Sequence, residues 1–411
     1  MIPSTSAEEP VRKAGPDKVL FSLASVILLD ALSYSLVLPL LPFILKSYDA
    51  GAAVGGGLVA IHAVFATLAA PALGTLSDRI GRKPVILGTI VGTALSYVLF
   101  GFSRNLTLLF VARALSGAMA ANSGVIHAAA ADHSASRARA KAMGLLNAAV
   151  AMGFVLGPAV SAVIGQSGEA AARWVGLTAA GASCFAFAFV AAGFDEPPRG
   201  IRQKGGARWP FVAHSWTLQL LALVLVAAMS HAGLVSMTAF WGAYAYGWGA
   251  REVGYLFCWV SVFMVIAQIA IVPRLANRLG ERLSLRVGLG LAVISLAALI
   301  VAPHSVPVLA LGGPLLFCGI TVVQTMCMSQ LSRQVEANER GALMGIANGA
   351  ASAGRIVGPA LCGMLFVHLQ PIAPYWLVAV ALGGWLIWLS LGAAPVDQVP
   401  SSSRNVTAKT S

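Results

Sequence analysis

The sequence predicts an all-α polytopic membrane protein with twelve transmembrane helices arranged in two six-helix, pseudo-symmetric halves. Three observations support this fold class: the composition, the number of long apolar runs and an internal repeat. The chain of 411 residues is 58% hydrophobic and only 10% charged, with a mean hydropathy of +0.81. Soluble domains devote about a quarter of their residues to charged side chains. This chain has too little polar material for a water-facing shell, so we expect it to lie in a lipid bilayer.

Twelve apolar runs are long enough to cross the bilayer as helices. About 20 apolar residues of helix span a hydrocarbon core of about 30 Å, and lipid leaves no backbone group unpaired. The runs lie at 19–41, 54–74, 84–102, 106–130, 140–164, 172–194, 216–242, 251–272, 283–302, 306–330, 341–369 and 373–394. The polar start MIPSTSAEEPVRKAGPDK has no signal-peptidase site, so we expect the first span to act as its own insertion signal.

Two blocks of sequence recur at nearly the same offset. AKAMGLLNAAVAMGFVLGPA (140–159) aligns with RGALMGIANGAASAGRIVGPA (340–360), and GTLSDRIGRK (74–83) aligns with PRLANRLGER (273–282). The chain therefore reads as two parallel repeats, a design that places a solute site between the halves near the bilayer midplane. The predicted divisions are an N-terminal tail 1–18, a first bundle 19–194, a linker 195–213, a second bundle 214–394 and a C-terminal tail 395–411.

Positive charge gathers on one side of these spans. Most of the 27 Lys and Arg residues fall in the two tails, in the linker, and in the loops that follow spans 2, 4, 8 and 10. The positive-inside rule then predicts a multi-pass protein of the inner membrane with both termini in the cytoplasm. The formal net charge of +12 is a topology signal on this interpretation, and we expect lipid but no nucleic acid as a partner.

Several segments resemble motifs of one transporter family. GTLSDRIGRK resembles the signature loop of the major facilitator superfamily. Three further segments resemble motifs of its drug/proton antiporter branch, namely LLDALSYSLVLPLLP (28–42), ARALSGAMAA (112–121) and GFVLGPAVSAVIG (153–165). LSRQVEANERGALMG (331–345) is similar to tetracycline/proton antiporters. The resemblance covers nearly the whole chain between residues 20 and 395.

The resemblance implies a monomeric exporter that exchanges protons for small amphipathic organic molecules, such as drugs or antibiotics, by alternating access. Two alternatives stay open within transport: export of an anionic or siderophore-like metabolite, and facilitated or uptake transport on the same fold. A non-transporting receptor is disfavoured because it has no use for charges inside the bilayer. An enzyme is the least supported class, since no nucleophile–base set or phosphate loop is visible.

The loop between spans 2 and 3 holds an acid among cations, which topology alone does not explain. Gly74 and Gly81 permit a tight reversal and close helix approach. The resemblance implies that Asp78 meets the start of span 11 in the outward-open state and that Asp132 pairs with Arg82. The second copy of the loop has Asn277 in place of Asp78, which predicts a one-sided latch. The predicted latch consists of Gly74, Asp78, Arg79, Gly81, Arg82, Lys83 and Asp132.

Three charged residues lie within spans, where they are expensive and functional by default. Asp30 and Arg113 fall at similar depths, so we expect them to pair and to couple transport to protons; a purely structural ion pair is the alternative. Arg355 either attracts an anionic substrate group or reaches the interface and helix carbonyls. The predicted cavity residues are Arg355, Trp241, Tyr244, His62, Asn147 and Asn348, with Tyr246 and Trp259 as further aromatic groups.

Glycine and proline interrupt spans 5 and 11 at matching positions. These residues are Gly153, Gly157, Pro158, Gly354, Gly358 and Pro359. Small residues allow close helix crossing, and the resemblance to the antiport motif implies that this packing seals the cytoplasmic side. Ser161 and Ala162 stand where the family usually has glycines, which weakens the second inference.

Other positions bear on which substrate is transported and on whether a metal or cofactor is bound. Tetracycline exporters carry acids in spans 3 and 9 and a histidine in span 8, where this chain has Ser96, Ala292 and Met264. Tetracycline itself is therefore a doubtful substrate. The histidines His62, His127 and His231 are read as packing residues, with proton relay as the alternative. The five cysteines lack paired spacing, so we expect neither a metal nor a cofactor.

Overall fold

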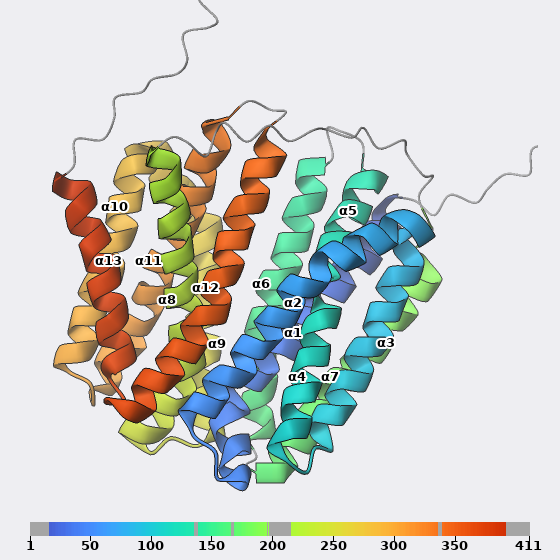
Figure 1. Cartoon of the computed structure of the whole chain (residues 1–411), viewed down its shortest axis with the longest axis horizontal. Helices are drawn as coiled ribbons and strands as arrows, with labels where there is room; N and C mark the ends of the chain where they lie inside the picture. The colour runs from blue at the N-terminus through green and yellow to red at the C-terminus, as the bar shows by residue number, and fades with distance from the viewer. Residues whose placement is uncertain are drawn as a thin grey trace, which may run out of the picture.

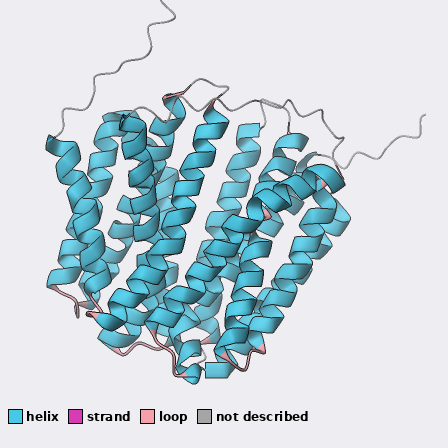
Figure 2. Cartoon of the chain, in the orientation of Figure 1, coloured by secondary structure: helices cyan, strands magenta, loops and turns pink. Residues whose placement is uncertain are grey.

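The computed structural model describes residues 16–134, 139–165, 168–194, 196, 215–335 and 339–391. Most of the predicted linker and both tails lie outside this part of the chain. The described residues form helices joined by short loops (Figures 1 and 2). The helices are α1 (Pro16–Leu45), α2 (Ala52–Ile80), α3 (Arg82–Gly101), α4 (Leu106–Ala120), α5 (Ser123–His133), α6 (Arg139–Ile164), α7 (Gly168–Gly193), α8 (Ser215–Tyr246), α9 (Ala250–Ile266), α10 (Val272–Val301), α11 (Val306–Arg333), α12 (Arg340–His368) and α13 (Ala373–Leu391), with short turns η1 (Lys46–Tyr48) and η3 (Ala267–Ile271).

Eleven stretches of described helix are long and apolar enough to cross a membrane, and one of them accounts for two predicted spans. That stretch, Ala250–Val301, has 52 residues, roughly 78 Å of helix, against a hydrocarbon core of about 30 Å. It is broken at Gly280, which has φ 74° and ψ 165°. Gly81, between α2 and α3, adopts φ 111° and ψ 162°. The two glycines were aligned by the sequence repeat, and both have a positive φ and an extended ψ. Because the stretch Ala250–Val301 is broken at Gly280, the structure is consistent with twelve spans.

The repeat predicted from the sequence is also present in the packing. In the first half, α6 crosses α1 so closely that a Cβ on Gly153 would lie 2.5 Å from the Leu28 carbonyl oxygen. In the second half, α12 crosses α8 in the same way, with a Cβ on Gly354 reaching 2.4 Å from the Leu225 carbonyl oxygen. Gly157 and Gly358 extend these two crossings. The predicted role of the glycines in close helix packing is therefore confirmed.

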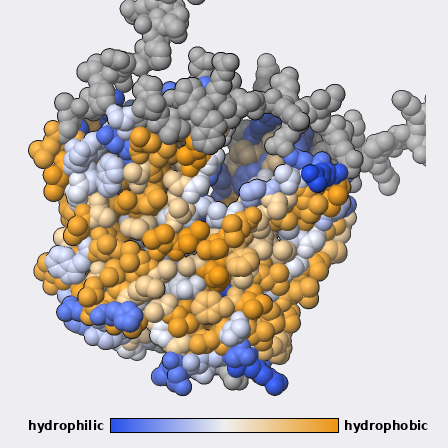
Figure 3. Space-filling model, in the orientation of Figure 1, coloured by the Kyte–Doolittle hydropathy of each residue, from blue (hydrophilic) through white to orange (hydrophobic). Residues whose placement is uncertain are grey.

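In the part of the chain that the structure describes, the two halves cross each other near one end of the bundle (Figure 1). We call the end that holds the start of α1 and the end of α13 the terminal face, and the opposite end the distal face. Near the distal face, Gly56 packs on the Pro359 carbonyl, and Gly254 packs on Ala162. Toward the terminal face α2 and α12 diverge, and the space-filling surface is hollowed between the halves (Figure 3). The structure is therefore open toward the terminal face.

Candidate functional site

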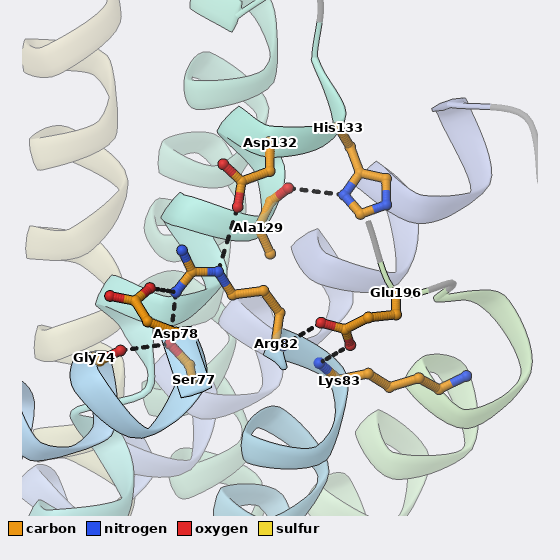
Figure 4. Close-up of polar contacts among 9 residues, drawn as sticks. All are labelled: Gly74, Ser77, Asp78, Arg82, Lys83, Ala129, Asp132, His133 and Glu196. Carbon is orange, nitrogen blue, oxygen red and sulfur yellow. Dashed lines mark hydrogen bonds and ion pairs between the residues drawn. The ribbon is translucent and has the colours of Figure 1, made fainter. Parts of the chain in front are cut away.

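A network of charges joins the loop after α2 to α5 at the terminal face (Figure 4). The guanidinium group of Arg82 lies 2.9 Å from the Asp78 carboxylate, one turn earlier, and 3.3 Å from Asp132 on α5. It also donates a hydrogen bond of 2.6 Å to the Ser77 hydroxyl. The predicted contact between Arg82 and Asp132 is confirmed. It fastens the hinge at Gly81 to the neighbouring helix.

One member of the predicted latch, Gly74, lies differently from the expectation. Gly74 is inside α2, and a Cβ added there would meet nothing within 4 Å, so it supports neither a reversal nor a close approach. The reversal takes place at Gly81 alone, because only that glycine adopts a positive φ. Arg79 is exposed in the last turn of α2, where it serves as a surface cation.

Glu196 is a member of this cluster that the sequence analysis missed. Its carboxylate accepts hydrogen bonds from the backbone N–H groups of Arg82 and Lys83 at the start of α3, the latter at 2.7 Å. A carboxylate is stabilising at a helix N-terminus. The Lys83 ammonium in turn donates to the Ala191 carbonyl at 3.2 Å, near the end of α7. No sequence pattern links position 196 to the loop more than a hundred residues earlier.

The second half carries a counterpart with the charges exchanged. Glu281, which aligns with Arg82, lies 3.2 Å from Arg333 and accepts a hydrogen bond from Ser329. Arg333 follows Asp132 by 201 residues, the offset that relates α6 to α12. In the first half the cation follows the glycine and the acid lies on the neighbouring helix, whereas in the second half the acid follows the glycine and the cation lies on the neighbouring helix. The second half therefore has an ion pair of its own at this place, but Asn277 still replaces Asp78, and the one-sided latch stays a prediction.

The charged residues inside the first half do not pair in this conformation. The Asp30 carboxylate accepts a hydrogen bond of 3.2 Å from the Asn122 amide, at the break between α4 and α5. Arg113 is 1% exposed, and none of its guanidinium nitrogens has a hydrogen-bond partner among the described residues. The group lies over the rings of Phe100 and Tyr34, 5.4 and 6.0 Å from their centroids.

The expected pairing of Asp30 with Arg113 is thus absent here, although both are placed in the same half. Depth along a helix was predictable, but the direction around the helix axis was not, and Asn122 competes for the carboxylate. Tyr97 lies within electrostatic range of both Asp30 and Arg113, so the two charges remain connected through a buried phenol.

Arg355 lies between the halves. It is halfway along α12, exposed, and donates a hydrogen bond of 2.8 Å to the Ser352 hydroxyl one turn earlier. It is within electrostatic range of Tyr34 on α1 and of His231 on α8. Since α1 and α12 belong to different halves, the interaction of Arg355 with Tyr34 runs from one half to the other.

The remaining predicted cavity residues divide into exposed and packed groups. Asn147 and Asn348 are both exposed, at matching positions of α6 and α12. Tyr244 is 63% exposed, with its ring against Phe366. His62 is buried, with Nδ1 3.1 Å from the Ser116 hydroxyl and its ring 4.9 Å from that of Tyr34. His62 therefore packs against the ring of Tyr34.

Trp241 is a correction to the predicted cavity. It is 5% exposed in the core of the second half, with its ring centroid 5.6 Å from that of Tyr375. It lies close to the distal end of α8, where the helices of this half close together. Tyr246 and Trp259 are likewise held by hydrogen bonds to backbone carbonyls, those of Pro303 and Ala310. An aromatic side chain near a helix end is a good core residue, and the sequence alone does not separate that role from a binding role.

The family follows from a match between the amino-acid sequence and a known family profile. The profile of the Major Facilitator Superfamily matches residues 23–332. The chain belongs to the Major Facilitator Superfamily. The family is one of transporters, which agrees with two six-helix halves around a central space.

Curated relatives within this superfamily include resistance proteins. The chain is 26% identical to the class B tetracycline resistance protein of Escherichia coli over 400 residues, 93% of this chain and 98% of that protein. It is 27% identical to multidrug resistance protein 1 of Bacillus subtilis over 359 residues, 85% of this chain and 90% of that protein. The chain is therefore similar to tetracycline and multidrug resistance proteins over nearly its full length.

Solved structures of other superfamily transporters share the fold. The human organic anion transporter MFSD10 has a TM-score of 0.67 at 21% identity, covering 92% of this chain and 100% of that one. A bacterial homologue of the human lysosomal transporter Spinster, inward-facing and occupied, has a TM-score of 0.74 at 16% identity, covering 93% and 96%. These similarities establish the fold of the two halves.

Proposed function

We propose that this protein is a proton-coupled exporter of small amphipathic organic molecules that works by alternating access. The observation that carries the proposal is the placement of two opposite charges, Asp30 and Arg113, in one half without a mutual contact while the bundle is open toward the terminal face. The relatives named for tetracycline and multidrug resistance support export as the direction. The terminal face, which carries the Lys- and Arg-rich loops, is cytoplasmic on this proposal.

The proton coupling follows from the cost of burying charge. A protonated Asp30 is satisfied by its hydrogen bond with Asn122, and Arg113 is then the uncompensated charge of this half. A deprotonated Asp30 gains free energy by approaching Arg113, since opposite charges in a poorly solvated site attract strongly. Loss of the proton therefore favours a different packing of α1 against α4, and the protonation of one carboxyl biases the conformation of the half.

Alternating access uses the contacts between the halves. In the conformation described, α2 meets α12 and α6 meets α9 near the distal face, which closes that side. The cytoplasmic opening admits the substrate, and rocking of the halves then exposes it to the distal side, where a proton enters. We propose a monomer, because one chain supplies both halves of the central space.

The decisive experiment is transport by Asp30→Asn in inverted membrane vesicles. The variant keeps the shape of the side chain and its contact with Asn122, but it neither binds nor releases a proton. Uptake driven by a pH gradient should fall to the background of vesicles lacking the protein, while the protein still reaches the membrane. Asp49→Asn, a substitution of an acid outside the spans, should leave uptake unchanged. Undiminished coupled uptake by Asp30→Asn would refute the proton-carrier role.

A further inference from the structure

We infer that the transported molecules carry an acidic group, and that Arg355 binds it between the halves with His231 and Tyr34 beside it. This inference rests on the proposed function and specifies its substrate class. It begins from the balance of charge inside the bilayer. Asp30 is the one acid deep in any span of the sequence, whereas Arg113 and Arg355 are two deep cations. The interior of the protein therefore carries an excess positive charge.

The environment of Arg355 leaves this charge available to a ligand. Its hydrogen bond to Ser352 is made with a neutral hydroxyl on its own helix. Among the described residues, no acid forms an ion pair with Arg355. A guanidinium group at the middle of a span is costly without a counter-charge. Because the side chain is exposed between the halves rather than packed, a counter-charge that enters with the substrate can reach it.

His231 supplies a second polar group on the same side of the space. Its Nδ1 atom is buried and has no hydrogen-bond partner among the described residues, while its ring packs edge-on against Phe317 at 5.5 Å. Buried polar atoms are normally paired, so an unpaired one is a position where an absent partner belongs. The helices that carry His231 and Arg355 cross closely beside them, since a Cβ on Gly354 would lie 2.8 Å from the Met229 backbone nitrogen. One acidic group at this crossing can meet both side chains.

Tyr34 closes the site from the opposite half. Its ring lies 4.9 Å from that of His62 and 6.1 Å from that of Phe154, and it is within electrostatic range of Arg355. The site therefore combines one forked cation, an imidazole, a phenol and aromatic faces. A guanidinium group binds carboxylates through two parallel hydrogen bonds, and aromatic rings accept an apolar body. An aromatic or aliphatic carboxylic acid fits this set better than an amine does.

The test uses three probes with one ring system and three charges: 1-naphthaleneacetate, its neutral amide and 2-(1-naphthyl)ethylammonium. Equilibrium binding of each radiolabelled probe is measured with the full chain in lipid nanodiscs. The wild type should bind the anion at least about tenfold more tightly than the amide, the factor expected of a charge-assisted hydrogen-bonded pair. It should bind the ammonium probe least. This comparison needs no substitution, so misfolding does not confound it.

Variants then assign the preference to its residues. Arg355→Gln should bring the ratio of anion to amide affinity near one, and Arg355→Lys should retain part of it, because lysine keeps the charge but loses the fork. His231→Ala should lower anion affinity several-fold with little effect on the amide. Arg104→Gln, which removes a cation near the distal face, is the control for net charge and should bind as the wild type does.

The outcomes that overturn the inference differ from those that overturn the proposed function. Equal binding of the three probes, tighter binding of the ammonium probe, no binding of the anion, or an unchanged ratio in Arg355→Gln each refutes the anionic substrate class. Proton exchange driven by cationic compounds in proteoliposomes, if it depends on Asp30, would leave the exporter intact while removing this inference. Loss of all proton coupling in the wild type would instead remove the exporter.

Discussion

At the scale of single residues, Arg113 is a buried cation whose guanidinium nitrogens have no hydrogen-bond partner among the described residues. Cation–π contacts with Phe100 and Tyr34 are worth about 0.5–2 kcal/mol each, whereas a buried charge without a hydrogen bond costs several kcal/mol. A side chain in this position lowers stability in the conformation described. Its presence is understandable if another step of the cycle uses the charge.

We therefore expect Arg113→Met to separate stability from function. The substitution fills the site with an apolar chain of similar length, so the thermal unfolding midpoint in detergent should stay the same or rise by a few degrees. Transport driven by a pH gradient in inverted vesicles should nevertheless be lost, since Asp30 has no cation to approach. A large fall in the unfolding midpoint would show instead that Arg113 is part of a structural ion pair.

The sequence predicted which residues carry charge inside the bilayer but not which neighbours they contact. Asp30, Arg113 and Arg355 stand out because charge within an apolar run is rare. Their partners depend on the rotation of each helix about its axis, which periodicity does not define in helices that are apolar on every side. Asn122 and Trp241 illustrate both consequences, one as a missed partner and the other as a core residue mistaken for a cavity residue.

At the scale of helices, glycine positions distinguish tight crossings from open surface. A Cβ on Gly354 would fall 2.4 Å from a backbone oxygen of α8, whereas one on Gly345 would meet nothing within 4 Å. Both glycines lie on α12, so helix propensity affects them alike and packing accounts for any difference between their variants.

We expect Gly354→Val to destabilise the second half and Gly345→Val to be tolerated. Overpacking against backbone costs about 1–3 kcal/mol or more, because main-chain atoms do not move aside as a flexible side chain does. Thermal unfolding followed by size-exclusion chromatography should show a lower midpoint for Gly354→Val alone. Equal midpoints for the two variants would mean that α12 and α8 are farther apart than described.

The charge-exchanged pair Glu281–Arg333 gives a second test at this scale. The Arg333 side chain is 74% exposed and that of Glu281 16%, so the pair is screened and worth about 1 kcal/mol or less. Glu281→Arg places two cations together, and it should slow transport several-fold while the protein remains folded. Adding Arg333→Glu should restore much of the rate. If the double variant is as slow as the single one, the pair has no role in the cycle.

The reversed order of charges explains why the Glu281–Arg333 ion pair was not visible in the sequence. Alignment of the two repeats finds identities such as Gly81 with Gly280, but a reversed ion pair appears as two mismatches. Attraction between opposite charges is unchanged when both signs are reversed, so the contact persists where sequence similarity is lost. The two halves and their spans were predictable from composition and repetition, whereas this contact required coordinates.

At the scale of the whole molecule, the closed distal side depends on small residues from both halves. Gly56 of α2 fits against the Pro359 carbonyl of α12, where an added Cβ would come to 2.1 Å. On the neighbouring position, a Cβ on Gly57 would make only an ordinary contact of 3.4 Å with Phe110. The halves therefore approach each other through one face of α2.

We expect Gly56→Val to prevent the distal side from closing, and Gly57→Ala to have little effect. In a background without the native cysteines, Asn348→Cys reports the opening through a membrane-impermeant maleimide. Labelling from the cytoplasmic side should fall in Gly56→Val, and labelling from the distal side should rise. If cytoplasmic labelling is unchanged in Gly56→Val, closure does not depend on this contact.

The single-residue breaks at Gly81 and Gly280 have a consequence for how the spans move. Helix continues to the residue before each glycine and resumes at the residue after it, so no loop separates the spans on either side. One residue reaches at most about 3.6 Å, so the ends of the two spans stay together at the terminal face in every conformation. Spans 2 and 3, and spans 8 and 9, therefore travel as paired units, and a displacement of one is passed directly to the other.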